Sequence, residues 1–335
     1  MMTLAKKLAL LLLVVSLFSC STPQKEIVSI KGNTMGTTYT VKFFPLTENK
    51  SEVEENYELI EKILKDINRQ MSTYIPTSEI SMFNKWQSTD LFRISYDFEK
   101  VLEKSFKYYY LSKGQYDITV MPLVNLWGFG PDKFESPPSQ AEIDSVMVFI
   151  GQDLIEFNGE TISKKDPRVQ IDLSSIAKGY AVDKIFNALN KYEDLFVEIG
   201  GEIRTKSKLK DWKIGINTPS ILNFQNDVEK IISLNNTSIA TSGNYRNFYV
   251  IDEKFYHHEI NPKTGYPTSS NLGSVSIISN ESCLDADALS TMFYNTNLEL
   301  STEIIESLDG VESLSIYLNE DEKFTKVFSS GFPKN

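Results

Sequence analysis

The sequence predicts an α+β protein, built as a single domain over residues 27–335 in which helices pack on largely antiparallel sheets. Short β-rich runs outnumber the stretches with helical periodicity, and the two kinds of segment do not alternate as a parallel βαβ fold requires. The chain has 335 residues, of which 41% are hydrophobic and 24% charged, a balance typical of a globular protein with a sizeable core.

Charge and rare residue types exclude several classes of function. The formal net charge of −11 leaves no basic surface for a polyanion, so we expect no nucleic-acid partner. The two cysteines, Cys20 and Cys283, cannot form a disulfide framework. The two histidines, His257 and His258, belong to no cluster with zinc-site spacing. A structural zinc protein is therefore excluded as well.

The N-terminus predicts a lipoprotein signal peptide over residues 1–19. Two lysines precede an apolar stretch at residues 8–15, and a small residue, Ser19, comes directly before Cys20. This ending resembles a bacterial lipoprotein signal, in which Cys20 becomes the lipidated first residue and residues 20–26 form a tether. The alternative is an ordinary secretory signal with an incidental cysteine. We expect a protein anchored to the cell membrane on its periplasmic side.

Two amphipathic helices are predicted in the first half of the chain. Apolar residues recur at helical spacing over residues 52–70, and Ser51 with Glu54 has the pattern of a capping box. A second such pattern extends from about residue 96 to 113, and Gly114 follows where a helix typically ends. Both apolar faces are expected to belong to the core.

Short β-rich runs fill much of the remainder. They are residues 38–44, 146–149, 169–173, 195–199, 212–216, 238–241, 248–251 and 273–278. Their clustering without regular helical crossovers favours antiparallel pairing.

Residues 171–183 predict a strand that turns into a helix near Ser174. Asp172 lies at the junction and Lys178 one turn later, so the turn offers amides, hydroxyls and a cation to an anionic ligand. The alternative is a capped core helix, which the spacing alone favours.

A further helix is predicted to open at Asp285. Asp287 and Thr291, at positions i and i+4, present two oxygen ligands on one face, which suits Mg²⁺ bound jointly with a phosphate. The alternative is capping of the helix by Asp285 or Asp287, which needs no metal.

In the order in which they occur, these segments resemble the bacterial FAD:protein FMN transferases, the ApbE-like flavin transferases. The matching segments are residues 35–37, 71–74, 78–81, 116–117, 122–129, 172–179, 200–201, 240–243, 258–265 and 286–289. The chain departs from the family at three places, because Asn261 and Glu202 stand where aspartate is common and Ser174-Ser175 where glycines are frequent.

The resemblance implies a set of ligand contacts. The implied FAD contacts are Met35, Tyr74, Gln115, Tyr116, Asp117, Asp172, Lys178 and Ile260. The implied magnesium ligands are Asp287, Thr291 and the backbone carbonyl of Ser175, with Asp285 as a neighbour. This set is all oxygen, as a hard cation requires.

The reaction that the resemblance implies is attack by a Thr or Ser hydroxyl of an acceptor protein on FAD, with transfer of FMN and release of AMP. Asp287 and His258 are the two candidates for the group that takes the proton. The implied partners are FAD, an acceptor protein of a membrane or periplasmic electron-transfer system, and the membrane through lipidated Cys20. The alternatives are an FAD pyrophosphatase and a non-catalytic flavin-binding lipoprotein.

Overall fold

The computed structural model describes residues 26–47, 49–219, 227–245, 247–319 and 323–333. The predicted signal peptide, Cys20 and all of the predicted tether except Glu26 lie outside these residues. Across the described ranges, no helix has the length and apolar character needed to cross a bilayer.

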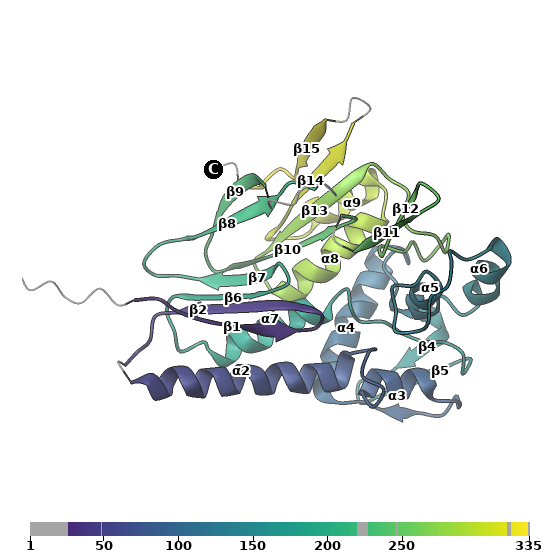
Figure 1. Cartoon of the computed structure of the whole chain (residues 1–335), viewed down its shortest axis with the longest axis horizontal. Coiled ribbons are helices and arrows are strands. Elements are labelled where there is room, and N and C mark those ends of the chain that lie inside the picture. Colours follow the sequence, from purple (N-terminus) through teal and green to yellow (C-terminus); the bar gives the residue numbers. More distant parts are fainter. Residues whose placement is uncertain (1–25, 48, 220–226, 246, 320–322, 334–335) are drawn as a thin grey trace, which may run out of the picture.

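An eight-stranded antiparallel sheet forms the centre of the molecule (Figure 1). Its strands, in spatial order, are β1 (Val28–Thr34), β2 (Thr37–Phe43), β6 (Leu195–Ile199), β7 (Glu202–Lys206), β10 (Thr237–Gly243), β13 (Leu272–Ser279), β14 (Val311–Leu318) and β15 (Phe324–Phe328). The spatial order follows the chain order, so the segments between neighbouring strands are insertions into one continuous meander.

Three smaller sheets surround the main sheet. They are β3 (Phe92–Arg93) with β5 (Thr161–Lys164) and β4 (Ile155–Phe157), the hairpin of β8 (Trp212–Asn217) and β9 (Val228–Leu234), and the hairpin of β11 (Phe248–Ile251) and β12 (Lys254–His257). Together with the main sheet they confirm the predicted α+β class with antiparallel sheets.

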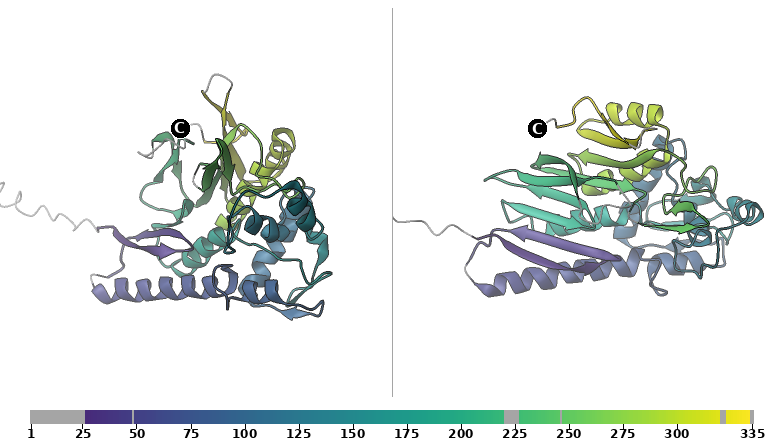
Figure 2. Two further views of the ribbon diagram at one scale, coloured as in Figure 1. Left: turned by 45° about the vertical axis from the view of Figure 1, so that its right-hand side comes forward. Right: turned by 45° about the horizontal axis from the view of Figure 1, so that its top comes forward.

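The helices gather mainly on one side of the large sheet (Figure 2). They are α2 (Lys50–Met71), α3 (Glu79–Lys85), α4 (Tyr96–Leu111), α5 (Met121–Leu126), α6 (Gln140–Met147), α7 (Ala177–Ala188), α8 (Cys283–Asn295) and α9 (Leu298–Ser307), with 3₁₀ turns η1 (Ile118–Val120) and η2 (Gln152–Leu154). Helix α7 packs on β6 and β7, α8 packs on β10 and β13, and α2 packs on α7 and β1.

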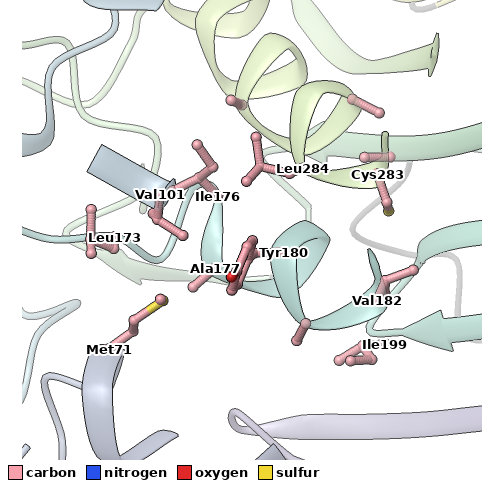
Figure 3. Close-up of a cluster of buried hydrophobic side chains, with 14 of the residues drawn as sticks. Met71, Val101, Leu173, Ile176, Ala177, Tyr180, Val182, Ile199, Cys283 and Leu284 are labelled. Carbon is pink, nitrogen blue, oxygen red and sulfur yellow. The ribbon is translucent and has the colours of Figure 1, made fainter. Parts of the chain in front are cut away.

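Alternate residues of the central strands point to two different cores, as the two-residue period of a strand requires. In β6, Val197 joins the main core beneath α7 and α8, whereas Phe196 joins a second core beneath the β8–β9 hairpin. Cys283 is a free thiol in the main core between α7 and α8, near Leu284 and Val182 (Figure 3). The cysteine therefore packs as a small hydrophobic side chain.

Both predicted helices are present with small differences at their ends. Asn49, not Ser51, caps α2, and its side chain accepts a hydrogen bond from the Ser51 N–H at 3.0 Å, so the predicted capping box is wrong. Helix α4 ends at Leu111, and the left-handed Lys113 and Gly114 follow it. The Gly114 N–H donates to the carbonyl of Tyr109, which closes the end of the helix.

Two of the predicted strands are wrong. Residues 146–149 fall at the end of α6, which a capping box of Ser139 and Glu142 begins. Residues 169–173 belong to none of the described strands. The Asn84 side chain instead accepts from the Ile171 N–H and donates to its carbonyl, both at 2.8 Å, and so replaces a neighbouring strand. Helix α7 accordingly begins at Ala177, later than predicted.

Candidate active site

A cavity of about 910 Å³ opens beside the N-terminus of α7 and the first turns of α8. This volume is near the upper end of the range for small-molecule sites, roughly 300–1,000 Å³. The residues predicted to bind FAD or metal, or to take a proton, all line it: Met35, Tyr74, Gln115, Tyr116, Asp117, Asp172, Ser175, Lys178, His258, Ile260, Asp287 and Thr291. Segments far apart in the sequence therefore meet at one place.

Asp287 is held by the close approach of two helices. The Gly179 N–H, in the first turn of α7, donates to Asp287 Oδ2 at 2.8 Å. A Cβ atom at residue 179 would lie 2.4 Å from the Cys283 carbonyl oxygen and 2.8 Å from the Asp287 Cβ, so only glycine fits. The positive end of the α7 dipole thus faces the Asp287 carboxylate.

Lys178 lies between two buried carboxylates. Its Nζ is 3.1 Å from Glu202 Oε1 and 3.7 Å from Asp287 Oδ1. Burial acts to lower the pKa of Lys178, but the charges of Asp287 and Glu202 outweigh it and raise the pKa. Burial raises the pKa of Asp287 to about 7; Lys178 opposes this shift and Glu202 adds to it.

Hydroxyl groups line the cavity next to Asp287. Thr291, one turn further along α8, has its Oγ1 3.2 Å from the Ser242 Oγ of β10. The Ser175 hydroxyl donates to the phenolic oxygen of Tyr116 at 3.0 Å, which places residue 175 at the cavity wall. Asp287, Thr291 and residue 175 therefore line one cavity, as a cation site made of their oxygen atoms requires.

The chemistry of these donors fits Mg²⁺ better than a transition metal. The described part of the chain contains no group of three His, Cys, Asp or Glu residues that could hold a metal ion by itself. One carboxylate with a hydroxyl and a carbonyl is the kind of incomplete set that Mg²⁺ uses when a substrate phosphate and water supply the other ligands.

Asp117 and Asp172 are buried carboxylates fixed by local turns. Asp117 caps η1 by accepting from the N–H and hydroxyl of Thr119, and burial raises its pKa to about 6. Asp172 accepts from the Ser174 N–H at 2.8 Å, and burial raises its pKa as well. Each still lines the cavity, where its carboxylate can receive a donor from a ligand.

Tyr74 and Met35 border the cavity from two different loops. The Tyr74 side chain is 65% exposed, and its hydroxyl donates to the Phe129 carbonyl at 2.9 Å. Met35 and Gly36 form the two-residue turn between β1 and β2, with φ of 49° and 73°. A left-handed methionine is strained, and such strain is concentrated at functional sites.

His258 lines the cavity, and one of its ring nitrogens forms a hydrogen bond with the backbone. Its Nδ1 lies 3.2 Å from the Asn247 carbonyl oxygen, which assigns the proton to Nδ1 and leaves the lone pair on Nε2. Burial, with smaller effects of His257 and Lys178, lowers the pKa of His258 to about 4. The imidazole is therefore neutral near pH 7.

The structure separates Asp285 from the predicted site. Asp285 does not line the cavity; it accepts from Lys104 at 2.7 Å and from Tyr108 at the α4–α8 interface. Ser282 caps α8 and donates to the same carboxylate. The predicted capping role of Asp287 is wrong, and Asp285 supports the start of the helix together with Ser282.

Glu202, Ser242 and Glu259 also line the cavity, and the sequence prediction gave none of them a role as a ligand contact. Burial raises the pKa of Glu259 to about 7, which a hydrogen bond from Ser242 and the charge of Lys178 lower only in part. For Glu202 and Glu259 the sequence offered only one indication of a role, their neighbours in the chain. Glu202 follows paired glycines and Glu259 follows His258.

Comparison with known proteins gives one consistent result. The model of the ApbE family matches residues 35–315. The FAD:protein FMN transferase of Haemophilus influenzae is 40% identical over 332 residues, covering 95% of this chain and 94% of that relative. The transferase of Vibrio cholerae is 36% identical over 325 residues, 94% of each chain.

A solved structure agrees with this sequence similarity. The structure of the flavin transferase ApbE from Vibrio cholerae matches with a TM-score of 0.82 and 35% identity, covering 92% of this chain and 98% of that one. The family match spans most of the described chain and includes the cavity residues from Met35 to Asn295. The chain belongs to the ApbE family.

Proposed function

We propose that this protein is an FAD:protein FMN transferase. The hydroxyl oxygen of a Thr or Ser in an acceptor protein forms a bond to the FMN-side phosphorus of FAD, the bond from that phosphorus to the AMP oxygen breaks, and AMP leaves. The observation that carries the proposal is the convergence of Asp287, Thr291 and Lys178 at the N-terminus of α7 in a cavity large enough for a dinucleotide.

Lys178 and the N-terminus of α7 supply the positive field for a diphosphate. Lys178 Nζ is held between Glu202 and Asp287, so its position is fixed before a ligand binds. Preorganised charge of this kind needs no rearrangement during the reaction. Tyr74 and Met35 offer an aromatic ring and an apolar side chain to a flavin or adenine ring at the rim.

His258 is the better of the two candidates for the group that takes the acceptor's proton. Asp287 Oδ2 already accepts the Gly179 N–H, and its carboxylate is the one assigned to the metal ion. His258 is neutral near pH 7 and carries its lone pair on Nε2, which lies 3.8 Å from Glu259 Oε1. We assign the general base to His258 on this basis.

Asp287, Thr291 and the Ser175 carbonyl are the residues that would hold Mg²⁺. When bound, the ion neutralises charge on the diphosphate and on the leaving oxygen. These three donors are all oxygen and include no histidine or cysteine, which supports this ion over zinc.

A denaturing gel viewed under ultraviolet light tests the activity. The protein is incubated with FAD, Mg²⁺ and a flavin-acceptor protein, with and without a chelator. Transfer gives a fluorescent acceptor band, and the chelator prevents the formation of this band. Free FMN without a labelled band would support a pyrophosphatase instead, and FAD binding without AMP release would support a non-catalytic flavin-binding protein.

We also propose that the mature protein is anchored by a lipid on Cys20. The apolar stretch and the small residue before Cys20 support this proposal. Cys20→Ser should move the protein from the membrane pellet to a soluble periplasmic fraction, whereas Cys283→Ser, at the buried thiol, should leave it in the pellet. Retention of the Cys20 variant in the pellet would contradict the anchor.

A further inference from the structure

Glu202 is a carboxylate inside the cavity that the proposed mechanism does not yet use. It begins β7 directly after Gly200 and Gly201, whose φ angles are 65° and 108°. The residue is only 4% exposed and lines the cavity. The glycine turn therefore places a charged side chain where water is largely excluded.

The two carboxylate oxygens of Glu202 have different surroundings. Oε1 lies 3.1 Å from Lys178 Nζ. Oε2 is buried and has no hydrogen-bond partner among the described residues. A buried carboxylate oxygen without a donor is costly, and such groups in folded proteins nearly always receive one. The missing donor is expected to come from a ligand.

The position of Glu202 restricts what that donor can be. Lys178 bridges the Oε1 atom of Glu202 to Asp287, so the Glu202 carboxylate lies beside the place assigned to the diphosphate. Its Oε2 lies next to Gly200, which also lines the cavity. Phosphate oxygens at neutral pH are acceptors and repel a carboxylate. The donors next to the diphosphate of FAD are metal-bound water and alcohol hydroxyls, and the hydroxyls belong either to the sugar chains of FAD or to the attacking residue of the acceptor. Metal-bound water would be present with pyrophosphate as well, so a comparison of FAD with pyrophosphate distinguishes it from a hydroxyl of FAD.

We propose that Glu202 Oε2 accepts the hydrogen bond of an alcohol hydroxyl of the bound substrates, next to the diphosphate. This inference rests on the proposed function and adds a substrate contact to it. A hydroxyl on FAD makes Glu202 a determinant of FAD affinity. A hydroxyl on the acceptor makes it an orienting group for the nucleophile, which hands its proton on to His258 and not to Glu202.

Glu202→Gln tests the contact because the amide has the same shape but only one acceptor atom. The negative charge opposite Lys178 is lost in either orientation of the amide, and with the NH₂ group toward the substrate the hydroxyl also loses its acceptor. Glu229→Gln is the matched control. Glu229 pairs with Lys326 at 2.5 Å and does not line the cavity.

Three quantities are compared between the wild type and both variants in Mg²⁺: the affinity for FAD, the affinity for inorganic pyrophosphate, and the rate of FMN transfer to an acceptor. Pyrophosphate has the diphosphate but no hydroxyl. If the hydroxyl is on FAD, Glu202→Gln weakens FAD binding by about tenfold to a hundredfold more than it changes pyrophosphate binding, which reports only the lost charge opposite Lys178. If it is on the acceptor, both affinities persist and transfer slows by a similar factor.

Equal weakening of FAD and pyrophosphate would overturn the inference, because Glu202 would then act only through Lys178. No change in any of the three quantities would overturn it as well. Thermal melts verify folding, and if Glu202→Gln does not fold, Glu202→Asp is measured by the same criteria, since it withdraws the oxygen by one methylene. A wild-type protein that neither binds FAD nor transfers FMN would reject the proposed function itself.

Discussion

Two aspartates on one helix, Asp285 and Asp287, lie two residues apart and have opposite surroundings. Burial alone would raise the pKa of Asp285, but hydrogen bonds from Lys104, Ser282 and Tyr108 outweigh it and lower the pKa. Burial raises the pKa of Asp287 to about 7, and its nearest cation is shared with Glu202. A fully paired carboxylate stabilises the fold, whereas a partly paired one keeps capacity for a ligand.

The largest expected effect is a loss of turnover, and it should occur on replacement of Asp287 but not of Asp285. Asp287→Ala is expected to lower AMP release at least about a thousandfold and to change FAD affinity by less than about tenfold, because the metal ion acts chiefly on the transition state. Asp285→Ala should instead lower the free energy of unfolding by roughly 3 kcal/mol, since it leaves Tyr108 and Lys104 without their partner.

Turnover assays and denaturant unfolding on both variants make the comparison. Normal turnover in Asp287→Ala would remove that residue from the site. Inactivity of well-folded Asp285→Ala would show that the contrast between the two faces of α8 is wrong.

Gly179→Ala should lower both the stability of the fold and the turnover. The added methyl group meets the Cys283 carbonyl and the Asp287 Cβ, so α7 and α8 must separate. Such overpacking typically costs about 1–3 kcal/mol, and a displacement of about 1 Å at a reacting group can lower turnover about a hundredfold. Thermal melts and AMP release measure the two losses, and a variant with normal values in both would contradict the packing argument.

Tyr74 tests the exposed rim of the cavity. Tyr74→Ala should weaken FAD binding by about one to two orders of magnitude, which corresponds to an aromatic contact of roughly 1–3 kcal/mol. Tyr74→Phe should retain most of the affinity, because it loses only the hydrogen bond to the Phe129 carbonyl. Since the side chain is 65% exposed, neither change should lower the melting temperature much.

Titration of FAD and thermal melts on these two variants decide whether the Tyr74 side chain contacts FAD or belongs to the core. Intact FAD binding with severely lowered melting would assign Tyr74 to the core instead.

The smallest effect concerns Lys164, a buried charge outside the cavity. It donates to the carbonyls of Asn84 and Pro167, and burial lowers its pKa to about 8 from the ordinary 10.5. The unfolded chain therefore binds more protons than the folded one as pH rises from 7 to 9, so stability rises with pH. The wild type should gain about 1 kcal/mol over this interval relative to Lys164→Met.

Urea unfolding of both proteins at pH 7, 8 and 9 measures this difference. A constant difference would mean that the pKa of Lys164 is not lowered by burial.

Sequence patterns predicted those helices and strands whose hydrophobic periodicity is visible within the segment itself. Helix α2 and strands β6 and β11 follow from periodicity, and the structure has them within a few residues of the expected ends. Residues 169–173 have the same β-rich composition but lie beside the Asn84 side chain, a contact 87 residues apart in sequence. Periodicity contains no information about such a partner.

The candidate site also depends on contacts between residues that are far apart in the sequence. Family resemblance located the cavity residues, but the local sequence distinguished Asp287 from Asp285 only by the i, i+4 spacing of Asp287 and Thr291, and both aspartates remained candidates for capping the helix. The distinction depends on Lys104, which is 181 residues from Asp285. Glu202 escaped attention as a ligand contact because its unpartnered oxygen is visible only once the fold surrounds it.

The strand order of the main sheet also limits when activity can arise during synthesis. Because neighbouring strands follow one another in the chain, the sheet can grow strand by strand from its β1 edge as the polypeptide appears (Figure 1). Asp287 and Thr291 lie on α8, after six of the eight strands. A truncated chain that stops before Cys283 would lack both the core residues of α8 and the cavity wall that Asp287 and Thr291 form, so detectable FMN transfer would report synthesis at least through α8.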